Sequence, residues 1–186
     1  MIPFFPEGFL LAAAQMVLGE FWMRRRGVSL RRRISILAWG AYGWLLLALV
    51  VFPLPVDCGS PGSNLEWILS RVNLRPFYYG EQPIPRAVAA DILGNLLLTL
   101  PAGAYLSLSS VSKRWVIAWA GLNLGIGLEG AQLVVSLGLG CAYRSVDIND
   151  LLLNAAGVWL GAGLVQLARR KMALRRSADS PANPGE

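Results

Sequence analysis

The residues that could do chemistry in this sequence are carboxylates, amides and one arginine set in otherwise apolar segments. The densest group is R-S-V-D-I-N-D-L-L-L-N at 144–154, which leads into an apolar run from Leu151 to Ala168. A membrane-spanning helix needs about 20 mostly apolar residues, and ionisable groups at that depth must face protein or water. We therefore expect one polar, ligand-binding site in a membrane protein. Its predicted residues are Asp91, Asn95, Glu129, Gln132, Arg144, Asp147, Asp150 and Asn154.

One spacing occurs twice in this set. The segments D-I-L-G-N at 91–95 and D-L-L-L-N at 150–154 each place an Asp four residues before an Asn. Residues four apart share a helix face, so each pair points in one direction. Structural explanations stay open: Asp147 can cap a helix with Asp150 in its first turn. The amides can equally serve as hydrogen bonds between helices, worth about 1 kcal/mol or less each.

The acids outnumber the nearby cations. Four carboxylates accompany Arg144, so the site must hold protons, a metal ion or a cationic group. Carboxylate and amide oxygens suit Mg²⁺ or Ca²⁺, whereas Arg144 could bind a phosphate or carboxylate with two parallel hydrogen bonds. The chain has no histidine, which excludes histidine acid–base catalysis. Glu129 and Asp150 remain candidate catalytic bases.

The apolar segments predict an all-α, polytopic membrane bundle of about five transmembrane helices. The chain is 55% hydrophobic, above the roughly 45–50% of ordinary soluble domains. We expect one transmembrane domain over 1–170, a disordered cytoplasmic tail over 171–186, and a short interfacial helix near Asn64 in the outer connection. The predicted spans are Gly8–Met23, Ile34–Val56, Ala87–Ser110, Trp115–Leu139 and Leu151–Ala168.

The basic residues fall at the ends of the apolar runs. With the N-terminus outside and the C-terminus cytoplasmic, thirteen Lys and Arg lie inside and four outside, as the positive-inside rule requires. We therefore attribute the net charge of +6 to orientation of the chain in the lipid bilayer, and not to binding of nucleic acid. Cys58 and Cys141 then both lie in outer loops, where disulfides form, and we predict a bond between them.

Four motifs follow one another in order: N-L-R-P-F at 73–77, D-I-L-G-N-L-L-L-T-L-P-A-G at 91–103, E-G-A-Q at 129–132 and R-S-V-D-I-N-D-L-L-L-N-A-A-G at 144–157. This series resembles the VanZ-like family over about residues 35–168. The resemblance implies a multi-pass protein of the bacterial inner (cytoplasmic) membrane. It also implies a link to teicoplanin resistance, and it marks the same eight polar positions as characteristic of the family.

Three functions remain open at this point. The leading hypothesis is an outward-facing pocket that binds a cell-envelope ligand, with a lipid-linked or anionic headgroup, and contributes to glycopeptide resistance. The second is a membrane-embedded transferase or hydrolase, metal-assisted or acid–base, that acts on such a lipid-linked substrate. The third is a non-catalytic structural or assembly protein whose polar residues only hold helices together.

Overall fold

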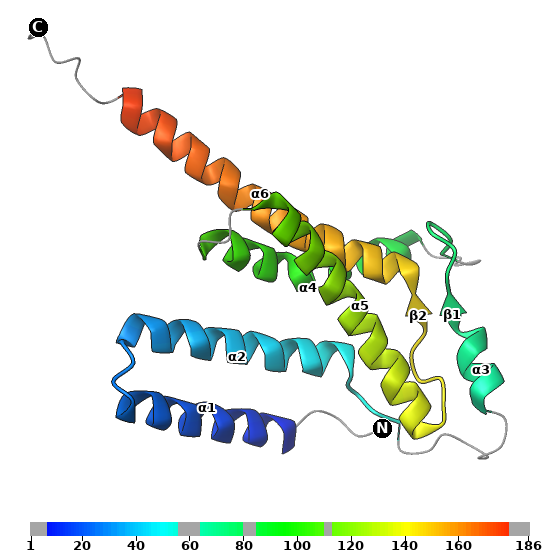
Figure 1. The fold of residues 1–186 in the computed structure, drawn as a ribbon. Coiled ribbons are helices and arrows are strands. Elements are labelled where there is room, and N and C mark those ends of the chain that lie inside the picture. Colours follow the sequence, from blue (N-terminus) through cyan, green and yellow to red (C-terminus); the bar gives the residue numbers. More distant parts are fainter. Residues whose placement is uncertain (1–6, 56–63, 80–84, 110–112, 179–186) are drawn as a thin grey trace, which may run out of the picture. The chain divides into compact units, whose positions relative to one another are not determined.

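The computed structural model describes residues 7–55, 64–79, 85–109 and 113–178 (Figure 1). It is all-α apart from two paired two-residue strands, which confirms the predicted class. Among the described residues, the four helices long and apolar enough to cross a membrane are α2, α4, α5 and α6. In chain order the elements are α1 (Glu7–Arg25), α2 (Leu30–Val50), α3 (Asn64–Ser70), β1 (Val72–Asn73), α4 (Pro85–Leu108), α5 (Arg114–Leu139), β2 (Val146–Asp147) and α6 (Ile148–Ala178).

The chain divides into two compact units. The N-terminal unit comprises Met1–Val72 with Ala131–Ser145, and the C-terminal unit comprises Asn73–Gly130 with Val146–Glu186. Helix α5 therefore contributes its first part to the C-terminal unit and its last part to the N-terminal unit. The carboxylates of the predicted site all belong to the C-terminal unit.

In the N-terminal unit, α1 and α2 form a helical hairpin. Gly27 adopts φ 66° at the turn, a left-handed conformation that glycine takes without a steric cost. Glu20 joins the two helices because its Oε1 atom lies 2.6 Å from both Arg24 Nε and Arg33 Nη1. Helix α1 is not among the helices that meet the length and hydropathy needed for a span in the described residues, so the first predicted span, Gly8–Met23, stays a prediction.

In the C-terminal unit, glycines let α6 pack directly on its neighbours. A Cβ atom added to Gly103, Gly157 or Gly161 would overlap backbone atoms of the facing helix in the α4–α6 pair. On α5, a Cβ at Gly125 would lie 2.6 Å from the carbonyl oxygen of Leu151 on α6. Small residues allow such close backbone approach in membrane helices. This packing brings polar side chains of α4 and α6 within hydrogen-bonding reach of each other.

The largest differences from the expected boundaries are at the C-terminal ends of α2 and α6. Helix α2 ends at Val50 instead of Val56, because Pro53 lacks an amide donor and disfavours helix before it. Helix α6 begins at Ile148 and continues to Ala178, past Lys171 where the disordered tail was expected. Its last turns contain good helix formers and no Gly or Pro. Residues 179–186 of that tail lie outside the described residues.

The expected short helix near Asn64 is present as α3, with Asn64 as its first residue. Its position in the membrane interface stays a prediction. Cys141 is buried, with 3% of its surface exposed. Its predicted partner Cys58 lies outside the described residues, so the disulfide also stays a prediction.

Candidate functional site

The start of α6 is built around Asp147. Its Oδ1 atom accepts a 2.8 Å hydrogen bond from the backbone N–H of Asn149, which is the geometry of an N-cap. In a capping box, the acid at the third helical position would accept the N–H of the capping residue. Here the Oε2 atom of Glu129, on α5, accepts the Asp147 N–H at 3.0 Å. Asp150, at that third position, is therefore left to face α4.

The two repeated Asp–Asn pairs meet across α4 and α6. Asn95 Nδ2 donates to Asp150 Oδ1 at 2.8 Å, and Asn154 Nδ2 donates to Asn95 Oδ1 at 3.4 Å. The carboxyl groups of Asp91 and Asp150 also adjoin each other closely enough to interact. Two ionised carboxylates repel each other, so such a pair needs a proton or a cation between its oxygens.

The exposure of the side chains falls steadily along the two Asp–Asn pairs. Asp91 is exposed, Asn95 and Asp150 are half-buried, and Asn154 is only 2% exposed. Below them, the fully buried Thr99 donates from Oγ1 to the carbonyl oxygen of Asn154 at 2.7 Å. Among the described residues, the Oδ1 atom of Asn154 has no hydrogen-bond partner, although buried polar atoms are nearly always paired. The cluster is thus exposed at Asp91, and its buried end contains the unpaired Oδ1 atom of Asn154.

A loop at 73–79 is tied to the start of α6. Asn73 Nδ2 lies 3.0 and 3.1 Å from the two carboxylate oxygens of Asp147. Asn149 accepts the N–H of Phe77 at 2.6 Å and donates to the carbonyl oxygen of Tyr78 at 2.9 Å. Phe77 has φ 62°, which is costly for a residue other than glycine. These hydrogen bonds hold the loop against that cost.

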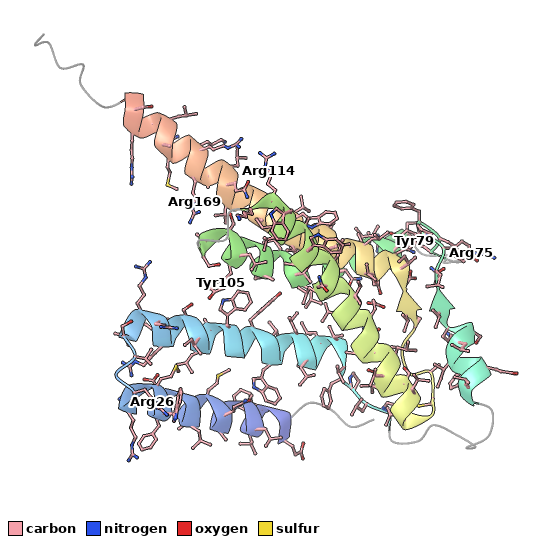
Figure 2. All side chains as sticks on the ribbon, in the orientation of Figure 1. Arg26, Arg75, Tyr79, Tyr105, Arg114 and Arg169 are labelled. Atoms are coloured by element: carbon pink, nitrogen blue, oxygen red, sulfur yellow. The ribbon has the colours of Figure 1, made fainter. Side chains whose placement is uncertain are left out.

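The same loop places Tyr79 near the acids; Figure 2 labels this residue beside Arg75, close to the start of α6. Partial burial, followed by the nearby charges of Asp91, Asp147 and Asp150, raises the pKa of Tyr79 above its ordinary value. Like any tyrosine whose pKa is not lowered, Tyr79 carries its hydroxyl proton at neutral pH. It adds a neutral hydrogen-bond donor to a group that is rich in acceptors.

Two predicted site residues belong to the N-terminal unit. Gln132 is buried there, with 8% exposure. Arg144 donates from Nη2 to the carbonyl oxygens of Leu49 at 3.2 Å and Phe52 at 3.0 Å. These carbonyls lie at the C-terminal end of α2, where a positive charge is favourable. Arg144 thus caps a helix in its own unit, and a role of Arg144 and Gln132 in ligand binding stays a prediction.

Sequence reasoning did not assign Asn73, Thr99, Asn149 or Tyr79 to the site. Three of them lie inside the motifs that were singled out, in N-L-R-P-F, D-I-L-G-N-L-L-L-T and R-S-V-D-I-N-D. Their partners are far away in the sequence. For example, the hydrogen bond between Phe77 in the loop and Asn149 on α6 joins residues 72 positions apart. Their membership in these motifs could therefore have identified them from the sequence, whereas helix periodicity could not.

No group of three or more His, Cys, Asp or Glu side chains among the described residues is arranged to hold a metal ion. The acids of the site are instead interleaved with amides and backbone N–H groups. Binding of Mg²⁺ or Ca²⁺ therefore stays an expectation from donor chemistry alone.

The described contacts join the motifs at 73–77, 91–103, 129–132 and 144–157 at residues of the C-terminal unit. Comparison with curated proteins and with solved structures found no match. A family model described as VanZ/LLP1 matches residues 39–169, which is more than half of the chain and includes all eight predicted site positions. The chain therefore belongs to the VanZ/LLP1 family.

Proposed function

We propose that the site at the start of α6 binds the polar headgroup of a lipid-linked cell-envelope ligand at the outer face of the bacterial inner membrane. The observation that carries this proposal is a buried acceptor without a partner, close to two adjoining carboxyl groups. Among the described residues these are the unpaired Oδ1 atom of Asn154 and the side chains of Asp91 and Asp150. The binding residues of the proposal are Asp91, Asn95, Glu129, Asp147, Asp150 and Asn154.

Helix association does not require these carboxyl groups. The glycine contacts already bring α4 and α6 together, and one pair of amides would add a bond between them. Within the described residues, neither Asp91 nor Asp150 forms a salt bridge with Lys or Arg. Two close acids are a net cost to the empty protein. They suit a ligand whose hydroxyl, amide or amino groups donate charge-assisted hydrogen bonds, as a saccharide-bearing lipid does.

The proposed outward orientation is supported by the charges along the C-terminal unit. From Asp150 to Arg169 is 169 − 150 = 19 residues of α6, or about 29 Å at 1.5 Å per residue. This length is close to the roughly 30 Å hydrocarbon core of a bilayer. The basic residues Arg114, Arg169 and Arg170 line one pocket at the far end of this distance from the acids. The positive-inside rule then favours acids outside and a cytoplasmic C-terminus.

The Asp91–Asp150 pair also supports a second candidate function. Two carboxyl groups that share a proton can supply one acid and one base. Of the two predicted bases, Glu129 is engaged with the Asp147 N–H, whereas Asp150 belongs to the pair at the open end. An acid–base transferase or hydrolase that acts on the same headgroup would therefore use Asp150 as its base.

The test compares the wild-type protein with an Asp91→Asn/Asp150→Asn variant, which keeps side-chain size and removes both acids. Each protein is purified from bacterial membranes in mild detergent, and its bound lipids are identified by mass spectrometry. We expect the wild type to retain a lipid with a hydroxyl-rich headgroup and the variant to lose it about tenfold, the effect of about 1.4 kcal/mol. The control is Asn123→Ala, whose amide, among the described residues, donates to the carbonyl oxygen of Trp119 on its own helix.

Equal amounts of that lipid on all three proteins would contradict the proposal. Equal amounts with a lower melting temperature for the double variant would favour the structural function instead. Conversion of the lipid to a product by the wild type alone would favour the enzyme. Teicoplanin susceptibility of expressing cells, measured with the same variants, tests whether any contribution to resistance depends on this site.

A further inference from the structure

A second site lies farther along α6, between Trp159 and Arg170. An apolar groove of about 460 Å³ runs between α5 and α6 and is rimmed by basic and amide side chains. Its floor includes the buried Ile117 and Ala162, and the indole of Trp159 forms one wall and donates to the carbonyl oxygen of Ala118 at 3.3 Å. A groove of this kind on a membrane helix pair fits a hydrocarbon chain.

A smaller basic pocket of about 300 Å³ adjoins this groove. It is lined by Ser107, Arg114, Gln166, Arg169 and Arg170, and it shares Arg114, Gln166 and Arg170 with the groove. Figure 2 labels Arg114 and Arg169 toward this end of α6. No Asp or Glu occurs at 92–128 or 151–178, so the helices that form the pocket carry no acid near it.

The arginines of this pocket have different tasks. Arg169 donates to the carbonyl oxygens of Ser107 at 2.8 Å and Leu108 at 3.3 Å, which caps the C-terminal end of α4. Arg114 and Arg170 have no hydrogen-bond or ion-pair partner in the described part of the chain. Two guanidinium groups beside an apolar groove, with no acid to pair with, are available for a phosphate.

We propose that this site binds an anionic phospholipid, with its phosphate between Arg114 and Arg170 and one acyl chain in the groove below. Basic pockets between transmembrane helices on the cytoplasmic side suit such headgroups. Gln166, which lines both cavities, adds a neutral donor where the headgroup meets the chain. This site is independent of the function proposed above, because the two share no residue.

The alternative explanation is that these arginines only orient the helix, as basic residues at span ends do. Arg175 and Arg176 provide the matched control, because they lie on the same helix and line neither cavity. Arg114→Gln/Arg170→Gln and Arg175→Gln/Arg176→Gln each remove two charges. Only the first pair changes the proposed pocket, and neither pair removes the α4 cap at Arg169.

Each protein is reconstituted in nanodiscs of phosphatidylcholine with a minor share of phosphatidylglycerol, and the lipids that remain after detergent extraction are quantified by native mass spectrometry. We expect the wild type and the Arg175/Arg176 variant to retain phosphatidylglycerol preferentially. The Arg114/Arg170 variant should lose this preference about tenfold, within the range for two surface arginines. Equal retention by both variants, whether high or low, would overturn the proposal.

A second pair of variants tests the groove without a change in charge. A Cβ at Gly163, in the groove wall, or at Gly127, on α5 outside it, meets nothing within 4 Å. Gly163→Leu should fill the groove and lower phosphatidylglycerol retention, whereas Gly127→Leu should not. Full retention by a folded Gly163→Leu protein would also overturn the proposal. Circular dichroism on all variants identifies any loss of helix.

Discussion

The two ends of α6 differ in how completely their polar groups are used. At its start, Asp147, Asp150 and Asn154 are bound to side chains or backbone of α4, α5 and the 73–79 loop. Toward its other end, Arg114 and Arg170 line an open basic pocket, and among the described residues only Arg169 of its three arginines is hydrogen-bonded. The first region is an ordered network, and the second is a set of exposed charges beside a groove.

Under the two proposals above, this difference predicts two kinds of selectivity. An ordered network fixes the direction of each donor and acceptor, so it can distinguish headgroups by geometry. Exposed arginines attract anions mainly through their charge, and this contribution falls as salt rises. We therefore expect the start of α6 to select a headgroup by shape and the other end to select phospholipids by charge.

The largest expected effect would break the network by separating its helices. In Gly157→Ala, the new Cβ would overlap Leu96 O and Thr99 Oγ1, so α4 and α6 must move apart. We expect a loss of about 3 kcal/mol, the upper part of the range for overpacking, seen as a lower melting temperature in detergent. Gly163→Ala is the control, because its Cβ enters open space. Equal melting temperatures would contradict the close packing of α4 on α6.

A smaller effect is expected where the network holds the loop. Asn149→Ala removes the acceptor of the Phe77 N–H and a donor to Tyr78 O. We expect a cost of about 2 kcal/mol for these unsatisfied groups and faster hydrogen exchange at 74–79, measured by mass spectrometry. Asn123→Ala, which breaks one bond within α5, should leave exchange at 74–79 unchanged. Unchanged exchange in Asn149→Ala would show that the loop is held by other contacts.

The smallest effect concerns the field of the acids at Tyr79. Asp147→Asn keeps an N-cap residue and removes one of the charges that raise the pKa of Tyr79. The pKa should fall toward its ordinary value without reaching it, because burial is the larger cause. The measurement is the ultraviolet titration difference between each protein and its Tyr79→Phe counterpart. A rise, or no change, would place Tyr79 away from the acids.

The raised pKa of Tyr79 also makes the free energy of unfolding depend on pH in a defined direction. The folded state binds the Tyr79 proton more tightly than the unfolded state does, so its contribution to stability is complete at a pH below the ordinary pKa. This contribution is lost as the pH rises through the folded value. The loss should therefore occur only in the alkaline range, and Tyr79→Phe should remove it.

The sequence predicted what depends on periodicity and composition. The apolar runs located α4, α5 and α6, and the Asp–Asn spacing placed each pair on one helix face. It did not predict that Glu129 would take the capping position beside Asp147, because this depends on how α5 crosses α6. The same limit applies to Asn149, whose partners are about 70 residues away in the chain. Arg114 and Arg170 were recognised as topology signals, but the groove beside them is a property of packing.

The most direct test of the two proposed sites on α6 compares their lipid binding in one measurement. Wild type, Asp91→Asn/Asp150→Asn and Arg114→Gln/Arg170→Gln are each incubated with phosphatidylglycerol and an uncharged glycosyl diacylglycerol, and bound lipids are counted by native mass spectrometry. We expect the aspartate variant to lose the glycolipid and keep phosphatidylglycerol, and the arginine variant to do the reverse. A parallel loss of both lipids in either variant, or of neither in both, would contradict two separate sites on α6.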